Sequence, residues 1–151
     1  SLSLRPLQLD DLGLVAALRS HLDRQASVGK LKPHFDARPL RSALSPEVET
    51  ACFRVAQEAI NNVLRHARAE NLWLSLSLED GRLVLRVRDD GQGFDVEAAR
   101  RRAAAGGSLG VVSMEERVAL AGGLFEIVTV PGQGTTMLAT FPLADPTPDP
   151  A

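Results

Sequence analysis

The stretch Asp89-Asp90-Gly91-Gln92-Gly93-Phe94 decides how this chain is interpreted. It follows residues 82–88, where apolar and basic side chains alternate as in a half-buried strand. Strand alternation places Asp89 on the same, core-facing side as Leu85 and Val87. A carboxylate there is costly unless it is hydrogen-bonded, and the two glycines would let a flat ligand approach the backbone. This pattern predicts a ligand site at the strand end, although an ordinary Asp-Gly turn would look the same.

The composition fits one soluble globular domain. Of 151 residues, 44% are hydrophobic and 24% are charged, and the net charge of −2 gives no indication of nucleic-acid binding. Cys52 is the single cysteine, which excludes a disulfide framework and a thiolate metal cage. No apolar run is long enough to span a membrane, and the N-terminus is not a signal peptide. Because the chain begins at Ser1 rather than Met, we expect it to be part of a longer protein.

The clearest helix pattern begins at Ser45. Ser45 is a good N-cap, and Pro46 suits the first helical position. Glu58, Asn62 and His66 follow at a spacing of four residues, so they stack along one edge of the buried face. Asn62 offers an amide oxygen to Mg²⁺, and Glu58 could act as a general base. Taken singly, each of the three is also compatible with a solvated or structural role.

Helix and strand patterns account for most of the remaining chain. We predict further helices over residues 10–26, 95–105 and 113–121, the last with Ser113 and Glu116 as a capping box. We predict strands over residues 30–37, 72–78, 82–89, 124–130 and 135–141, with a hairpin turn at Asp80-Gly81. These elements indicate an α+β fold, a two-layer α/β sandwich with helices on one face of a mixed, mostly antiparallel sheet.

The chain is expected to divide into three parts. Residues 1–9 show no periodicity and are interpreted as a linker, residues 10–143 as one domain, and residues 144–151, with three prolines, as a disordered tail.

Three glycine-rich turns beside a polar helix stripe indicate a nucleotide pocket. The turn from Gly107 to Gly110 precedes a helix and could offer N–H groups to phosphates, or it could be a plain loop. Asp89 could accept a hydrogen bond from an exocyclic amine, which favours adenine. The chain has neither a P-loop nor a complete dinucleotide fingerprint, and its three histidines lack metal-ligand spacing.

Several segments together resemble the GHKL-type ATPases. Residues 57–67, Gln-Glu-Ala-Ile-Asn-Asn-Val-Leu-Arg-His-Ala, resemble the N box, most closely that of sensor histidine kinases related to nitrate and membrane-fluidity sensors. Residues 89–93 are similar to the G1 box, and residues 109–118 to the G2 box and the helix after it. Residues 132–136 resemble the last glycine box, and residues 4–14 the join to the phosphoacceptor helices. The resemblance covers about residues 4 to 142.

The resemblance implies a role for each matching residue. Asp89 would bind the adenine amine with help from Thr136, Asn62 would hold Mg²⁺, and Glu58 would be the catalytic base. Arg65 and His66 would lie along the nucleotide, and Gly91 and Gly93 would shape its adenine end. The phosphate lid would consist of Gly107, Ser108, Leu109 and Gly110.

The resemblance also implies an activity and partners. ATP and Mg²⁺ would be the cofactors of a cytoplasmic histidine protein kinase domain, which would phosphorylate a histidine on a dimerisation domain outside this chain, for relay to a response regulator. The isolated domain would be a monomer without nucleic-acid or direct membrane contact, and the parent a homodimer, membrane-anchored or not.

Two features depart from the family pattern. No phosphoacceptor segment is present, because His21 falls on the first helix of the domain, so the chain should bind ATP without phosphorylating itself. Glu115 stands where arginine is usual, which bears on lid docking and nucleotide affinity. The alternatives are an anti-sigma-factor-like serine kinase that holds a partner, and a degenerate ATP-binding regulatory module.

Overall fold

A single mixed sheet forms one layer of the molecule. The computed structural model describes residues 5–40, 44–104 and 110–143. Within these ranges the strands are β1 (Lys32–Ala37), β2 (Asn71–Glu79), β3 (Arg82–Asp89), β4 (Leu124–Val130) and β5 (Gly134–Pro142). They are ordered β1-β2-β3-β5-β4, with β1 parallel to β2 and the other neighbouring pairs antiparallel.

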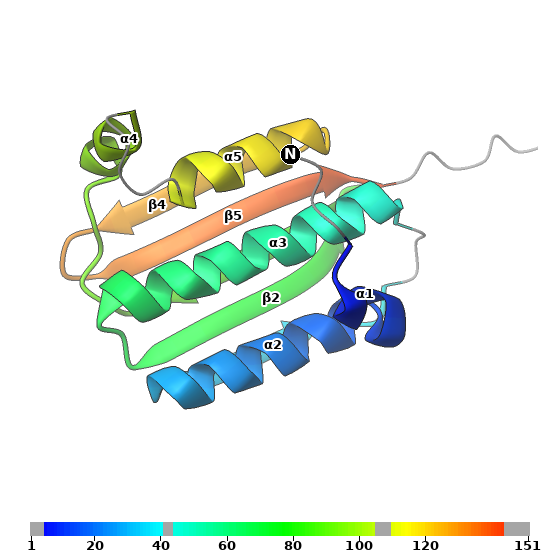
Figure 1. The fold of residues 1–151 in the computed structure, drawn as a ribbon, viewed down its shortest axis with the longest axis horizontal. Helices are drawn as coiled ribbons and strands as arrows, with labels where there is room; N and C mark the ends of the chain where they lie inside the picture. Colours follow the sequence, from blue (N-terminus) through cyan, green and yellow to red (C-terminus); the bar gives the residue numbers. More distant parts are fainter. Residues whose placement is uncertain (1–4, 41–43, 105–109, 144–151) are drawn as a thin grey trace, which may run out of the picture.

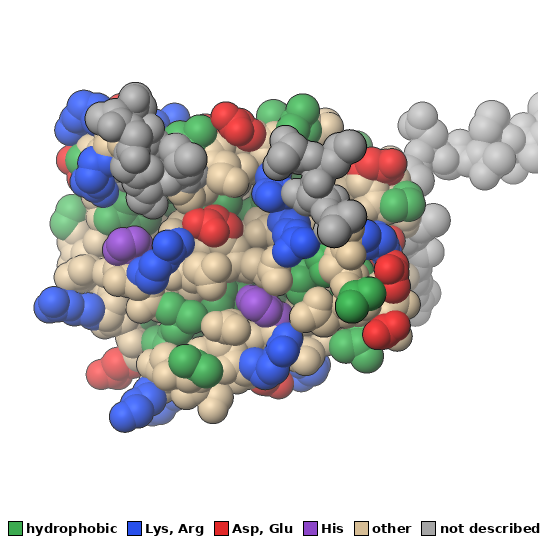
Figure 2. Space-filling view, viewed as in Figure 1, with side chains coloured by type: hydrophobic (Ala, Val, Ile, Leu, Met, Phe, Trp, Pro, Cys, Tyr) green, Lys and Arg blue, Asp and Glu red, His purple; other side chains and the backbone are tan. Residues whose placement is uncertain are grey.

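Helices cover one face of this sheet. The described helices are α1 (Leu7–Leu12), α2 (Leu14–Gly29), α3 (Pro46–Asn62), α4 (Val96–Ala104) and α5 (Gly110–Leu120), with a π-helical turn, Val63–Ala67, continuing α3. Figure 1 shows α2, α3 and α5 side by side across the sheet. The predicted two-layer sandwich is therefore confirmed. On the helix side, Figure 2 shows charged side chains of both signs. None of the described helices is long and apolar enough to cross a bilayer.

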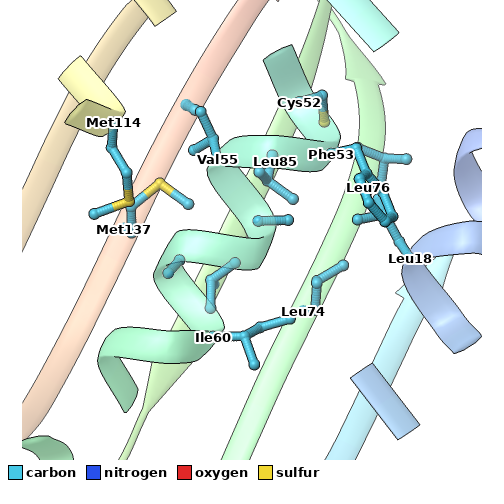
Figure 3. Close-up of a cluster of buried hydrophobic side chains, with 14 of the residues drawn as sticks. Leu18, Cys52, Phe53, Val55, Ile60, Leu74, Leu76, Leu85, Met114 and Met137 are labelled. Carbon is cyan, nitrogen blue, oxygen red and sulfur yellow. The ribbon is translucent and has the colours of Figure 1, made fainter. Parts of the chain in front are cut away.

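The central helix, α3, begins as its sequence predicts. The Ser45 hydroxyl accepts a hydrogen bond from the Val48 N–H at 3.1 Å, and Pro46 occupies the first turn. Its apolar side chains pack onto the sheet, where Phe53 and Ile60 are fully buried (Figure 3). Strand side chains such as Leu85 meet them from below. This packing fixes the direction of α3 and hence the position of its polar edge.

The β2–β3 hairpin brings Asp89 to the end of the buried row. Glu79 pairs with Arg82, so the loop is Asp80-Gly81, and both loop residues have positive φ, as a type I′ turn requires. The row of β3 side chains that faces the helices is fully or almost fully buried and ends at Asp89, which is 4% exposed. The predicted orientation of Asp89 is confirmed.

The N-terminal prediction is wrong in detail. Helix α1 already begins at Leu7, and Leu9 is buried in the core, so residues 7–9 are structured rather than part of a linker. Gly13, at φ 78°, then separates α1 from α2, where a single helix from residue 10 was predicted. A glycine adopts this backbone conformation readily, and its N–H bonds to the Leu9 carbonyl, which ends the first helix.

The start of α5 also differs from the prediction. The helix begins at Gly110, three residues before the expected Ser113 cap, so the capping box is not formed. Val111 and Met114 are buried against the rest of the core, and this packing requires helical geometry from the beginning of that segment. The predicted tail and most of the predicted lid, including Gly107, Ser108 and Leu109, lie outside the described residues.

Candidate functional site

A cavity of about 380 Å³ lies where α3, the end of β3 and the start of α5 meet. Asn62 and Asp89 both line it, although they come from different layers of the fold. The other lining residues combine basic or polar and apolar side chains, notably Arg65, His66, Arg68, Arg102, Phe94, Ile127, Thr135 and Met137. The structure therefore brings Asp89 and Asn62 together at one cavity, as the sequence predicted.

The Asp89 carboxylate is held in place by the turn that follows it. Its Oδ1 accepts a hydrogen bond from the Gly91 N–H at 2.8 Å. Burial raises the pKa of Asp89, and the hydrogen bond from Gly91 opposes that shift. A buried carboxylate with few competing donors is a strong acceptor for a ligand N–H group.

The two glycines of the turn are required for different contacts. Gly91 does not line the cavity, and a Cβ there would lie 2.2 Å from the carbonyl oxygen of Ala67. Gly93 does line it; its φ is 72°, and an added Cβ would lie 2.5 Å from the carbonyl oxygen of Val130. The glycine at position 91 therefore lets the turn pack against the end of the α3 segment.

Thr136 is not beside Asp89, so this prediction is wrong by one residue. In the β3–β5 register Asp89 pairs with Thr135, whereas Thr136 pairs with Arg88 on the opposite face of the sheet. Thr135 lines the cavity, and its hydroxyl donates to Thr129 Oγ1 at 3.0 Å. A one-residue change of register moves a side chain to the other face.

The π-helical turn Val63–Ala67 supplies a basic edge to the cavity. It ends at Arg68, whose positive φ of 52° stops the helix, and π-helical turns recur at functional sites. Arg65 and His66 lie within the turn and line the cavity, and the Gln92 side chain donates to the His66 carbonyl at 2.6 Å. This edge suits a polyanion such as a phosphate chain.

Arg68 and Arg102 also line the cavity, although neither was predicted from the sequence. Arg68 directly follows the N-box segment, a position that could have been included, whereas Arg102 comes from α4 and has no local signal.

Glu58 lies just outside the main cavity, one helical turn before Asn62. Its Oε1 is 3.2 Å from Arg65 Nη2, and it lines a second cavity on the helix side. Gly110 approaches both residues, because an added Cβ would lie 2.6 Å from Glu58 Oε1 and 3.0 Å from Asn62 Oδ1. The start of α5 thus lies against the Glu58–Asn62 edge.

This arrangement of fold and site defines a GHKL-type ATPase domain. Residues 47–145 match the family model for histidine kinase-, DNA gyrase B-, and HSP90-like ATPases, and the chain belongs to this family.

Two sensor kinases are similar in sequence to this chain over most of its length. The histidine-protein kinase/phosphatase DegS of Bacillus subtilis is 36% identical over 143 residues, and the sensor histidine kinase MctS of Rhizobium johnstonii is 40% identical over 139. These alignments cover 93% and 92% of this chain, but only 37% of DegS and 30% of MctS.

Solved structures share the fold. The histidine kinase domain of the Erythrobacter litoralis EL346 blue-light activated kinase aligns with a TM-score of 0.72 at 22% identity, over 86% of this chain and 61% of that one. Full-length ShkA in complex with AMPPNP aligns with a TM-score of 0.72 at 24% identity, over 95% and 32% respectively.

Proposed function

We propose that this chain is the catalytic, ATP-binding domain of a sensor histidine kinase. It would transfer the γ-phosphoryl group of ATP to a histidine on a dimerisation and phosphoacceptor domain outside this chain, for relay to a response regulator. The observation that carries the proposal is the shared cavity of Asp89 and Asn62 in a chain of this ATPase family. The sensor-kinase names of DegS and MctS favour this reading over an anti-sigma-factor-like protein.

The strand end of the cavity suits an adenine ring. Val87, Ile127 and Met137 provide apolar contacts there, and the Asp89 carboxylate accepts a hydrogen bond from the exocyclic amine. Guanine would present a carbonyl oxygen to the same carboxylate, leaving two acceptors facing each other. Unpaired buried acceptors are costly, which gives the site its preference for adenine.

The helix end of the cavity suits the phosphates. Arg65, Arg68 and Arg102 add positive charge to the cavity wall, and Asn62 would hold Mg²⁺ through its amide oxygen. A single protein ligand fits Mg²⁺, which takes phosphate and water oxygens for its remaining positions and neutralises charge on the phosphates when bound. Phosphoryl transfer depends mainly on such positioning and charge neutralisation.

Glu58 is placed to assist the acceptor. Its carboxylate lies one turn from Asn62 on α3 and opens to the second cavity rather than to the adenine. We assign it the role of accepting, at its carboxylate, the proton on the second ring nitrogen of the imidazole, whose other nitrogen attacks the γ-phosphorus through its lone pair. Arg65, which is ion-paired with Glu58 here, would keep that carboxylate oriented.

We also propose a location and an oligomeric state for the parent protein. The domain would act in the cytoplasm, as a monomeric unit within a homodimeric parent.

Phosphorylation of the full-length kinase with γ-labelled ATP tests the proposal. Wild type should incorporate label into its acceptor histidine, and Asn62→Ala should lose at least about tenfold in rate, because the side chain that would hold Mg²⁺ is removed. Robust ATP binding without any incorporation would identify the degenerate regulatory module instead.

A further inference from the structure

A second cavity, of about 260 Å³, lies on the helix-covered side between α2, α3 and α5. The side chains that line it are all polar: His21, Arg54, Gln57, Glu58, Asn61, Ser113 and Arg117. We call this group the α2–α3–α5 pocket. Figure 2 shows basic side chains beside a histidine near the middle of this face. Its polar wall distinguishes it from the nucleotide cavity, which has a large apolar part.

The pocket adjoins the nucleotide cavity along a single turn of α3. Glu58 lines the pocket, Asn62 lines the nucleotide cavity, and Gly110 approaches both side chains. A group that enters the pocket therefore comes close to the residues assigned to phosphoryl transfer.

His21 gives independent evidence that the pocket takes a ligand. Its side chain is buried, with 8% exposed, and packs edge-to-face on Phe53 at 5.8 Å between ring centroids. No described residue hydrogen-bonds its Nε2, which lies buried at the pocket. Burial, together with the charge of Arg24, lowers the pKa of His21, so the ring is neutral at neutral pH. A buried nitrogen without a partner costs free energy, and a bound polar group would recover it.

The charge of the pocket favours a monoanion. Arg54 and Arg117 bring two positive charges and Glu58 one negative charge, so the wall is positive by a single charge. Arg54 is held in orientation by donating to Gln57 Oε1 at 3.0 Å. Guanidinium groups with nearby hydroxyl and amide donors, here Ser113 and Asn61, match a carboxylate. A carboxylate would neutralise this wall, whereas a phosphate dianion would leave a net negative charge beside Glu58.

We propose that the α2–α3–α5 pocket binds a carboxylate side chain of the domain that presents the acceptor histidine. The proposal rests on the proposed function, because only a phosphoryl acceptor must reach the Glu58–Asn62 edge. The carboxylate contacts Arg54 and Arg117, and this contact sets the position of the acceptor over Glu58. Arg54 and Arg117 are positioning residues and do not contact ATP.

Charge reversal in the full-length kinase tests the proposal. Arg54→Glu and Arg117→Glu should each lower the rate of self-phosphorylation at saturating ATP at least about tenfold, while the KM for ATP stays within about twofold. Arg86→Glu, on the exposed β3 side of the sheet, is the matched control and should change neither value. Arg117→Gln is a milder variant, with a smaller loss expected, and circular dichroism checks that every variant is folded.

The outcomes separate this proposal from the proposed function. Unchanged phosphorylation in folded Arg54→Glu and Arg117→Glu proteins would overturn the pocket assignment and leave the kinase assignment intact. A second substitution, of an acidic residue of the acceptor domain to Lys, can be added to the Arg117→Glu protein. Restored phosphorylation in this double variant would support the pocket assignment. Absence of ATP binding in wild type would instead contradict the kinase function.

Nuclear magnetic resonance of the His21 ring distinguishes the two possible anions. In the present chain, sodium acetate should shift the His21 ring signals in wild type and shift them less in Arg117→Gln. A larger response to inorganic phosphate than to acetate at equal concentration would contradict the choice of a carboxylate.

Discussion

The buried carboxylate of Asp89 makes the stability of the nucleotide-free domain depend on pH. Burial raises its pKa, so between the ordinary and the raised value the folded state binds more protons than the unfolded state. Its contribution to stability therefore falls as pH rises through that window. Thermal unfolding should show Asp89→Asn gaining stability relative to wild type at about pH 7 and losing that advantage below about pH 3.5.

Asp90 is the matched control for this experiment, because its pKa is shifted in the opposite direction to that of Asp89. Hydrogen bonds from the Asn71 side chain and backbone, and from the Glu70 N–H, lower its pKa. The stability it contributes is present above the ordinary carboxyl pKa and is lost as pH falls through the lowered value. Asp90→Asn should thus be destabilised at about pH 7. The same pH trend for both variants would contradict the assignment.

The register of β5 predicts a difference between two adjacent threonines. Thr135→Val should weaken ATP binding by about 1 kcal/mol, because the hydroxyl lies at the cavity and bonds to Thr129. Thr136→Val has the same change of shape on the other face and should leave binding within about 0.3 kcal/mol of wild type. Calorimetric titration of both variants measures this, and a larger loss for Thr136→Val would show that the register is wrong.

Single residues were predictable where their strand or helix determined their direction. Alternation along β3 was enough to place Asp89, and the spacing along α3 was enough to place Asn62. Thr136 was misplaced because its face depends on pairing with β3, a contact distant in sequence. The close contact of Gly91 with the Ala67 carbonyl was not predicted, because it has no local signature in the sequence.

Helix α4 is linked to α5 by an ion pair that involves the unusual Glu115. Arg100 Nη2 lies 3.1 Å from Glu115 Oε1, and two residues further along α4 Arg102 lines the nucleotide cavity. We expect Glu115→Arg to weaken ATP binding about threefold, because repulsion from Arg100 would displace Arg102. Fluorescence titration with a labelled nucleotide measures the effect.

The double variant provides the control. Arg100→Glu combined with Glu115→Arg should return the affinity to within about twofold of wild type, because the pair is re-formed with its charges exchanged. An affinity no better than that of Glu115→Arg alone would show that the pair does not position α4.

Elements were predictable where capping or turn chemistry was strong. Ser45 and Pro46 marked the start of α3, and Asp80-Gly81 marked the hairpin. The start of α5 was misjudged because burial of Val111 and Met114 outweighed the local capping signal at Ser113. The π-helical turn after α3 was missed because nothing in the local pattern of apolar residues differs from an α-helix.

The stability of the whole domain depends on the contact between α3 and the sheet. Ile60 is fully buried in that contact, and Ile60→Ala should lower the free energy of unfolding by about 2 to 5 kcal/mol. Leu120 is 90% exposed on α5, so Leu120→Ala should change the free energy of unfolding by less than about 0.5 kcal/mol. Urea unfolding of both variants tests this, and equal losses would contradict the described core.

The layered architecture was readable from the sequence, but the strand order was not. Alternation in β2 and β3 predicted a sheet with one covered face, and the amphipathic α3 predicted what covers it. The order β1-β2-β3-β5-β4 inserts the last strand between β3 and β4. That pairing depends on contacts between segments about fifty residues apart, which composition and periodicity do not encode.

Calorimetric titration of the present chain with ATP and Mg²⁺ tests the central claim most directly. We predict that wild type binds ATP and that Asp89→Asn binds it at least about tenfold more weakly, because the amide cannot replace the charged acceptor for the adenine amine. Equal affinities for wild type and Asp89→Asn would contradict the adenine assignment, and no binding by wild type would contradict the nucleotide site as a whole.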